Sequence, residues 1–390
     1  MRKNLVARNT LFILIVIYFL QGTIFQRGSF ISQLVYILII IISSSYIFSS
    51  LRKSSKVTYK FLVTWFLFYT LIFLSFLLSG ELNDFGHFSM AKGALFNFVL
   101  FYPCFYFSYS GSLDEKSLSH FCLIMLPVFV LNYNLNEANI LVERISLKDN
   151  VVNNVSYFFV GLIPFLFFFE RKKIISYSVL ATSLFFIVLS AKRGAFLSGT
   201  TGFLFFIFYD LFKGGSKNLR TRILTFIFVP LFSLLLFNFL FDNANYLITR
   251  IESAADYNSS GRDFIIGNIL DNWISSHSLF NYIFGFGFAS TLKLSETGNY
   301  AHNDWVEVLC NFGILGLTLF FLEFVFLIKA SFEKKLSIKH RFVLVCVLVV
   351  IFINTLFYRF YSGIDSFLYS IILGYLLGTL SKNEKFYFQK

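Results

Sequence analysis

The sequence turns from polar to apolar within one short stretch, GNYAHNDWVE at residues 298–307, which runs into an apolar segment that continues past Gly316. His302 therefore stands just before a predicted membrane helix. Its side chain suits proton transfer at neutral pH, and a helix N-terminus offers N–H groups and a positive dipole end to an anion. A purely structural interpretation also fits, because Asp304 with Glu307 three residues on matches a capping box that would only start the helix.

The composition around this stretch is that of a membrane protein. Of the 390 residues, 57% are hydrophobic and only 14% are charged, and long apolar runs alternate with short polar segments. This pattern excludes a soluble globular protein and is typical of a polytopic membrane protein. The cysteines indicate no disulfide framework, because all of them fall inside apolar runs, where a thiol behaves as a small hydrophobic group. They are Cys104, Cys122, Cys310 and Cys346.

Apolar runs long enough to approach a membrane crossing predict an all-α polytopic protein of about twelve helices, forming a single integral membrane domain over residues 1–390. A crossing takes about 20 residues, so the long segment 174–212 is divided at SAKRG, residues 190–194. The predicted spans are residues 11–25, 30–48, 61–78, 94–109, 121–133, 157–169, 174–189, 195–212, 223–241, 305–328, 342–357 and 367–380.

The basic residues predict which ends of these helices face the cytoplasm. With the N-terminus inside, 23 of the 33 Lys and Arg residues fall on inner segments and 10 on outer ones, as cytoplasmic loops require. The long segment 242–304 is then an extracytoplasmic loop that carries part of the site. Within it, residues 261–273 have the spacing of an amphipathic helix at the interface, and residues 139–147 are a second such candidate.

Three candidate functional residues share the outer face in this topology: Arg193, Arg262 and His302. Guanidinium groups match phosphate oxygens and stay charged, so the two arginines favour a site for an anion. Simpler roles remain open for both, since Arg193 could reach lipid headgroups or cap a helix and Arg262 could be a solvated charge. Arg359, flanked by tyrosines at an outer helix end, is typical of a boundary anchor.

Other functional classes lack their usual signals. The remaining histidines show no metal-ligand spacing, and the chain contains no Walker loop and no dinucleotide fingerprint, so the sequence predicts no metal and no cofactor. The net charge of +12 follows from the cytoplasmic loops and does not require nucleic acid as a partner.

Several of these segments together resemble a known family. HNDW at residues 302–305 followed by NFGILG at 311–316 resembles the signature of the O-antigen ligase and O-antigen polymerase superfamily, bacterial membrane glycosyltransferases that act on undecaprenyl-pyrophosphate-linked glycans. SAKRGA at 190–195 is similar to its arginine turn, and SGR at 260–262 with FGFG at 284–287 to its loop arginine and glycine motif. The family usually has Glu at the position of Asn311. The resemblance covers the second half of the chain.

The resemblance implies a C-type glycosyltransferase-like fold and metal-independent transfer on the outer face of the bacterial inner membrane. In that reaction His302 is the general base for an acceptor sugar hydroxyl. Arg193 and Arg262 bind the donor's pyrophosphate and stabilise it as it leaves. We also predict substrate binding by four further residues: Lys192, Asn303, Asp304 and Arg359.

The implied partners are the undecaprenyl-pyrophosphate-linked donor, a glycan acceptor and membrane lipid, with a chain-length regulator and a flippase as further candidates. Between the two activities of the superfamily we favour a polymerase for O-antigen or capsular polysaccharide, because the outer loop is compact. The alternative is a ligase that transfers the glycan to lipid A core or to protein. A transporter of polysaccharide or lipid-linked glycan is the alternative of another class. A purely structural membrane protein is the fourth interpretation.

Overall fold

The structure is a computed structural model of the 390-residue chain, and it describes residues 2–80, 84–147, 153–169, 173–190, 192–212 and 262–388. Every regular element in these ranges is a helix, which confirms the predicted all-α fold. The elements are α1 (Arg2–Phe19), α2 (Phe30–Ser44), α3 (Ile47–Lys53), α4 (Lys56–Leu78), α5 (Phe85–Tyr109), α6 (Glu115–Leu147), α7 (Ser156–Leu162), η1 (Ile163–Phe168), α8 (Lys173–Leu189), α9 (Arg193–Phe212), α12 (Arg262–Ile274), α13 (Leu279–Phe284), α14 (Thr291–Leu294), α15 (Asp304–Ser331), α16 (Ile338–Phe357), η2 (Ile364–Ser366) and α17 (Phe367–Phe388).

The helices have the length and composition of membrane spans. Within the described ranges, eight helices are long and apolar enough to cross a membrane, and Ser156–Phe168 and Lys173–Leu189 are shorter apolar helices. Eleven of the twelve predicted runs overlap a helix of the structure, and the remaining run, 223–241, lies outside the described residues. The polytopic architecture is therefore confirmed, while the count of twelve stays a prediction.

Two sequence boundaries were wrong. The first run was expected to extend to residue 25, but α1 ends at Phe19, because the chain turns at Gly22, whose φ of +90° suits glycine. Residues 139–147 were expected to form a separate interfacial helix; instead they continue α6 without a break to Leu147. The expected helix at 261–273 is confirmed as α12.

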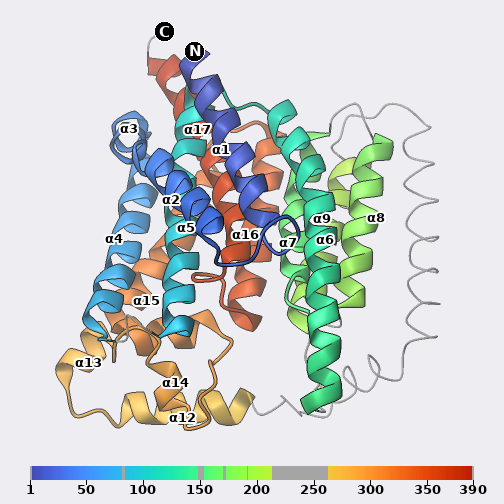
Figure 1. The fold of residues 1–390 in the computed structure, drawn as a ribbon. Helices are drawn as coiled ribbons and strands as arrows, with labels where there is room; N and C mark the ends of the chain where they lie inside the picture. The colour runs from blue at the N-terminus through green and yellow to red at the C-terminus, as the bar shows by residue number, and fades with distance from the viewer. Residues whose placement is uncertain are drawn as a thin grey trace.

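The two ends of the bundle carry different structures. Both termini lie at one end, here called the terminal end, whereas α12, α13 and α14 cover the opposite end, here called the site end (Figure 1). Contacts between distant segments support this arrangement: the Arg8 guanidinium donates to the Ser117 hydroxyl at the start of α6 over 2.7 Å. The starts of α7, α9 and α15 and the turn between α16 and α17 all lie at the site end.

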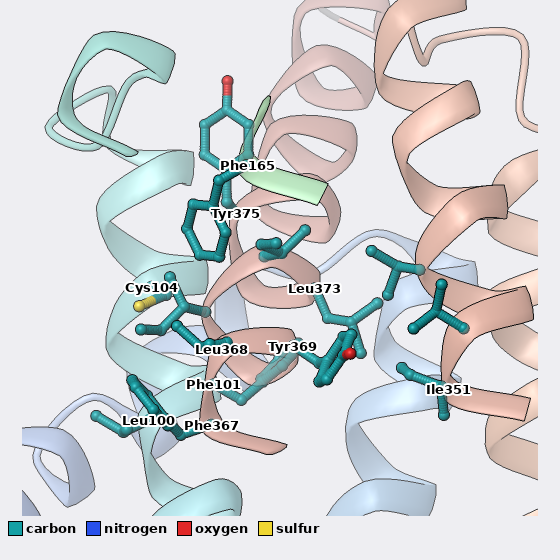
Figure 2. Close-up of a cluster of buried hydrophobic side chains, with 14 of the residues drawn as sticks. Leu100, Phe101, Cys104, Phe165, Ile351, Phe367, Leu368, Tyr369, Leu373 and Tyr375 are labelled. Carbon is teal, nitrogen blue, oxygen red and sulfur yellow. The ribbon is translucent and has the colours of Figure 1, made fainter. Parts of the chain in front are cut away.

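The centre of the core is the contact between α5 and α17, whose buried side chains Figure 2 shows. Gly374 and Gly378, spaced four residues apart on α17, let the backbones approach closely. A Cβ at Gly374 would lie 2.6 Å from the Phe101 carbonyl oxygen, and one at Gly378 would lie 2.3 Å from that of Phe105. Small residues at this spacing are a common way to pack membrane helices, because lipid supplies no hydrophobic drive for their association. This contact fixes the α16–α17 turn, which contributes to the site.

Candidate functional site

The site is built around the first turn of α15. Asn303 caps this helix, since its side-chain oxygen accepts from the backbone N–H groups of Trp305 at 3.0 Å and Val306 at 3.3 Å. The alternative of a capping box with Asp304 as the cap is therefore wrong, because Asn303 is the cap. The fully buried Asp304 carboxylate instead accepts from the backbone N–H groups of Phe360 at 2.9 Å and Tyr361 at 3.1 Å. Asp304 thus fastens the α16–α17 turn to the start of α15.

The next turns of α15 hold the loop that carries α14. The Thr291 hydroxyl donates to the buried Glu307 carboxylate at 3.3 Å. One helical turn on, the Asn311 side-chain oxygen accepts from the Ser290 hydroxyl at 2.9 Å and its amide nitrogen donates to the Tyr361 hydroxyl at 3.3 Å. An amide can accept and donate at once, which gives a physical reason for Asn where the family usually has Glu.

The two glycine motifs form a single contact. Gly313 interrupts α15 with φ of +66°, and the carbonyl groups of Cys310 and Asn311 accept from the backbone N–H groups of Phe286 at 2.8 Å and Gly287 at 3.1 Å. A Cβ at Gly313 would lie 2.3 Å from the Ile283 carbonyl oxygen, and one at Gly285 would lie 2.4 Å from the backbone of Asn311. Neither position tolerates a side chain, so the motifs hold α13 against α15.

His302 occupies a strained position between α14 and α15. Its φ of +51° is in the left-handed region, which is uncommon outside glycine, and its Nδ1 atom is buried without a hydrogen-bond partner in the described part of the chain. Such strain persists only where the surrounding structure enforces it, here the capped start of α15 and the loop from α14.

Three cations from separate parts of the chain act electrostatically on this imidazole. Burial, followed by the positive charges of Arg262, Lys192 and Arg359, lowers the pKa of His302 to about 3. Arg262 begins α12, Lys192 precedes α9, and Arg359 lies in the α16–α17 turn. The imidazole is consequently neutral at pH 7, the form that can accept a proton.

Arg359, for which the sequence allowed both a boundary anchor and a substrate-binding role, acts electrostatically on His302. Its guanidinium carbon lies 3.8 Å from the centre of the Tyr300 ring, a cation–π contact. Its Nη1 atom is buried and has no hydrogen-bond partner among the described residues. A held, buried guanidinium nitrogen without an acceptor is suited to receive an anionic ligand.

The predicted Arg193 is the first residue of α9 and is half-buried. Its neighbour Lys192 acts electrostatically on His302. The next residue, Gly194, packs against α7 and α16, because a Cβ there would lie 2.4 Å from the Tyr157 hydroxyl and 2.7 Å from the Phe357 Cβ. The turn that carries Arg193 is therefore in contact with the site-end parts of α7 and α16.

Buried polar atoms without a partner gather at the site end. Because buried polar groups are normally hydrogen-bonded, such a cluster indicates space prepared for a polar ligand or water. Sequence reasoning missed Tyr157, Ser362 and Asp365, which lie inside or at the edge of apolar runs. Of the three, only Asp365 had a usable signal in the sequence, because it is an acidic residue next to a predicted span. The unpartnered atoms of the described residues at this end include His302 Nδ1, Asp304 Oδ1, Glu307 Oε1, Arg359 Nη1, Tyr157 Oη, Ser362 Oγ, Asp365 Oδ2 and Trp273 Nε1.

Fold and site together define a polytopic membrane protein with a buried, basic, imidazole-containing site at one end of its helix bundle. The described residues contain no group of three or more His, Cys, Asp or Glu side chains that could hold a metal ion. Residues 178–321, from α8 to the middle of α15, match the family model described as O-antigen ligase. No curated protein matches the chain.

The family match confirms the resemblance of this chain to the O-antigen ligase and O-antigen polymerase superfamily. It includes Lys192, Arg193, Arg262 and His302. The family implies a bacterial membrane glycosyltransferase-like enzyme whose substrates are lipid-linked glycans.

Proposed function

We propose that this protein is a polymerase of lipid-linked oligosaccharide repeat units, for O-antigen or capsular polysaccharide, with its site end facing the outside of the bacterial inner membrane. The observation that carries the proposal is the neutral imidazole of His302, whose Nδ1 atom is buried without a partner among the described residues and on which Arg262, Lys192 and Arg359 act electrostatically. This arrangement offers a proton acceptor beside positive charge, the two requirements for displacing a pyrophosphate leaving group with a sugar hydroxyl.

In the proposed reaction, His302 accepts the proton of the acceptor hydroxyl while its oxygen forms a bond to the anomeric carbon of the donor glycan. The bond between that carbon and the pyrophosphate oxygen breaks, and its electron pair leaves with undecaprenyl pyrophosphate. Arg262, Arg359 and the Lys192–Arg193 turn stabilise the charge that develops on the leaving group. No metal ion takes part in this scheme.

Asn303 and Asp304 act in this scheme by fixing the site. Asn303 holds the helix start immediately after His302, and Asp304 holds the turn that carries Arg359. Both contacts keep the His302 imidazole and the Arg359 guanidinium at a constant separation. Such positioning lowers the barrier because the groups need not reorganise during the reaction.

A ligase is the second candidate, favoured by the match of residues 178–321 to the family described as O-antigen ligase. The two activities share the donor and the leaving group and differ in the acceptor, which is another lipid-linked repeat unit for a polymerase and a core sugar or protein hydroxyl for a ligase. Identification of the stalled product therefore separates them.

The test is to delete the gene in its bacterial host, restore it with wild type, His302→Ala or His277→Ala, and separate the surface glycans on a gel. His277 is an exposed histidine between α12 and α13 and serves as the matched control. A ladder that collapses to one repeat unit on its carrier with His302→Ala supports a polymerase. Full-length glycan stranded on undecaprenyl pyrophosphate indicates a ligase, and an unchanged ladder with His302→Ala overturns both and favours a transporter.

A further inference from the structure

A buried hydroxyl beside the first turn of α9 has no role in the scheme above. Tyr157 is fully buried, and its hydroxyl has no hydrogen-bond partner in the described ranges. A buried phenol normally finds a partner, because leaving its O–H unmatched costs free energy. An unmatched phenol at a site end rich in cations therefore indicates a ligand that supplies an acceptor.

The Tyr157 ring is held firmly, so its hydroxyl has a defined direction. It stacks on Tyr358 with ring centres 4.0 Å apart and planes inclined by 21°. The Tyr358 hydroxyl in turn donates to Asp365 over 3.1 Å. This chain of contacts orients Tyr157 from the α16–α17 side, whereas its hydroxyl lies against Gly194 on α9.

The first turn of α9 provides further hydrogen-bond donors next to that hydroxyl. The helix ladder begins with the bond from the Phe196 N–H to the Lys192 carbonyl at 2.9 Å, so the amides of Gly194 and Ala195 have no acceptor within the helix. A helix N-terminus also concentrates positive potential, which favours an anion. The charged groups that act electrostatically on Tyr157 are Asp365, Arg262 and Asp304, of which Arg262 is the cation that could face an anion.

We propose that the Tyr157 hydroxyl and the N-terminal turn of α9 form a phosphate subsite, which binds a phosphate oxygen of the donor's leaving group. This inference rests on the proposed function and adds to it an uncharged hydrogen-bond donor, the Tyr157 hydroxyl. The glycine at position 194 is explained by the same contact, since any side chain there would separate the phenol from the helix.

The test is to measure binding of undecaprenyl pyrophosphate to the purified full-length protein in lipid nanodiscs, comparing wild type with Tyr157→Phe. Phenylalanine retains the stack on Tyr358 and removes only the hydroxyl. Loss of one hydrogen bond to a charged group should raise Kd about tenfold or more. Undecaprenol, which lacks phosphate, should show no difference between the two proteins.

Tyr102→Phe is the matched control, because Tyr102 is also fully buried with an unpartnered hydroxyl but lies on α5 within the central packing. Its Kd should equal that of wild type. With repeat-unit donor, Tyr157→Phe should raise KM and leave kcat nearly unchanged, a split that a general loss of structure would not produce.

The outcomes separate this inference from the proposed function. Equal Kd values for wild type and Tyr157→Phe overturn the subsite and leave the role of His302 intact. Wild-type protein that does not bind undecaprenyl pyrophosphate overturns both. If Tyr157→Phe is not monodisperse, Gly194→Ala tests the contact from α9, since its Cβ would displace the phenol; wild-type affinity in that variant also overturns the subsite.

Discussion

The terminal end and the site end of the bundle differ in how their buried charged side chains are paired. At the terminal end, Glu115 accepts from His340 at 2.9 Å and forms an ion pair with Lys339, and Asp210 is paired with Lys173 and accepts from Tyr177 at 2.7 Å. At the site end, His302, Arg359 and Tyr157 keep buried atoms without partners. Paired charges join helices, whereas a cluster of unpartnered buried atoms is suited to a polar ligand.

The sharpest test of this comparison is to replace one histidine at each end and to measure activity on the purified protein. His302→Gln keeps a polar side chain of similar size and removes the basic imidazole, so kcat should fall by about 10²–10⁴, the usual contribution of general base catalysis. His340→Gln at the terminal end should leave kcat near wild type. Equal losses in the two variants would remove the functional distinction between the ends.

The second largest effect is expected for an arginine at the site end. Arg359→Lys retains the charge but loses the planar guanidinium that stacks on Tyr300 and offers two parallel donors. We expect KM for the lipid-linked donor to rise about tenfold, as a lost charged hydrogen bond implies. The matched change Arg52→Lys, at the end of α3, should leave KM unaltered. A wild-type KM in Arg359→Lys would show that the Arg359 guanidinium does not contact the donor.

The pH dependence of stability offers a third, smaller contrast. The pKa of His302 is lowered to about 3 in the folded protein by burial and the three cations, against about 6.5 unfolded. Between these values the unfolded chain binds the extra proton, so the contribution of neutral His302 is complete above pH 6.5 and is lost as the pH falls. The melting temperature of wild type should therefore drop more steeply from pH 7 to 4 than that of His302→Gln. Parallel curves would contradict the environment described for this imidazole.

The smallest effect is expected at the terminal end. Glu115→Gln removes the carboxylate that joins α6 to α16 but leaves the site untouched. Because the Glu115 side chain is 23% exposed, solvent screens the pair and the loss should be about 1 kcal/mol or less. A slightly lower melting temperature with unchanged kcat and KM is the expected result. A large loss of activity would show that the two ends are coupled through α16.

The sequence predicted the fold because apolar runs and basic loops follow from the membrane itself. It also identified Lys192, Arg262 and His302, since charged or titratable groups stand out beside apolar helices. It could not locate Tyr157, because a tyrosine inside an apolar run has no periodic signal. The local spacing also allowed Asp304 to be a helix cap, whereas its partners are the backbone N–H groups of Phe360 and Tyr361, which local spacing cannot reveal because they lie far along the chain.

The interruption of α15 at Gly313 has a consequence for how this site can change during evolution. Two helix carbonyls, those of Cys310 and Asn311, take their hydrogen bonds from Phe286 and Gly287 in place of the next turn. The segment that carries α13 and α14 is thereby joined to the backbone hydrogen bonds of α15. Recombination that exchanges this segment must carry residues 285–287 and 310–313 together, so the segment and the first half of α15 are inherited as one unit.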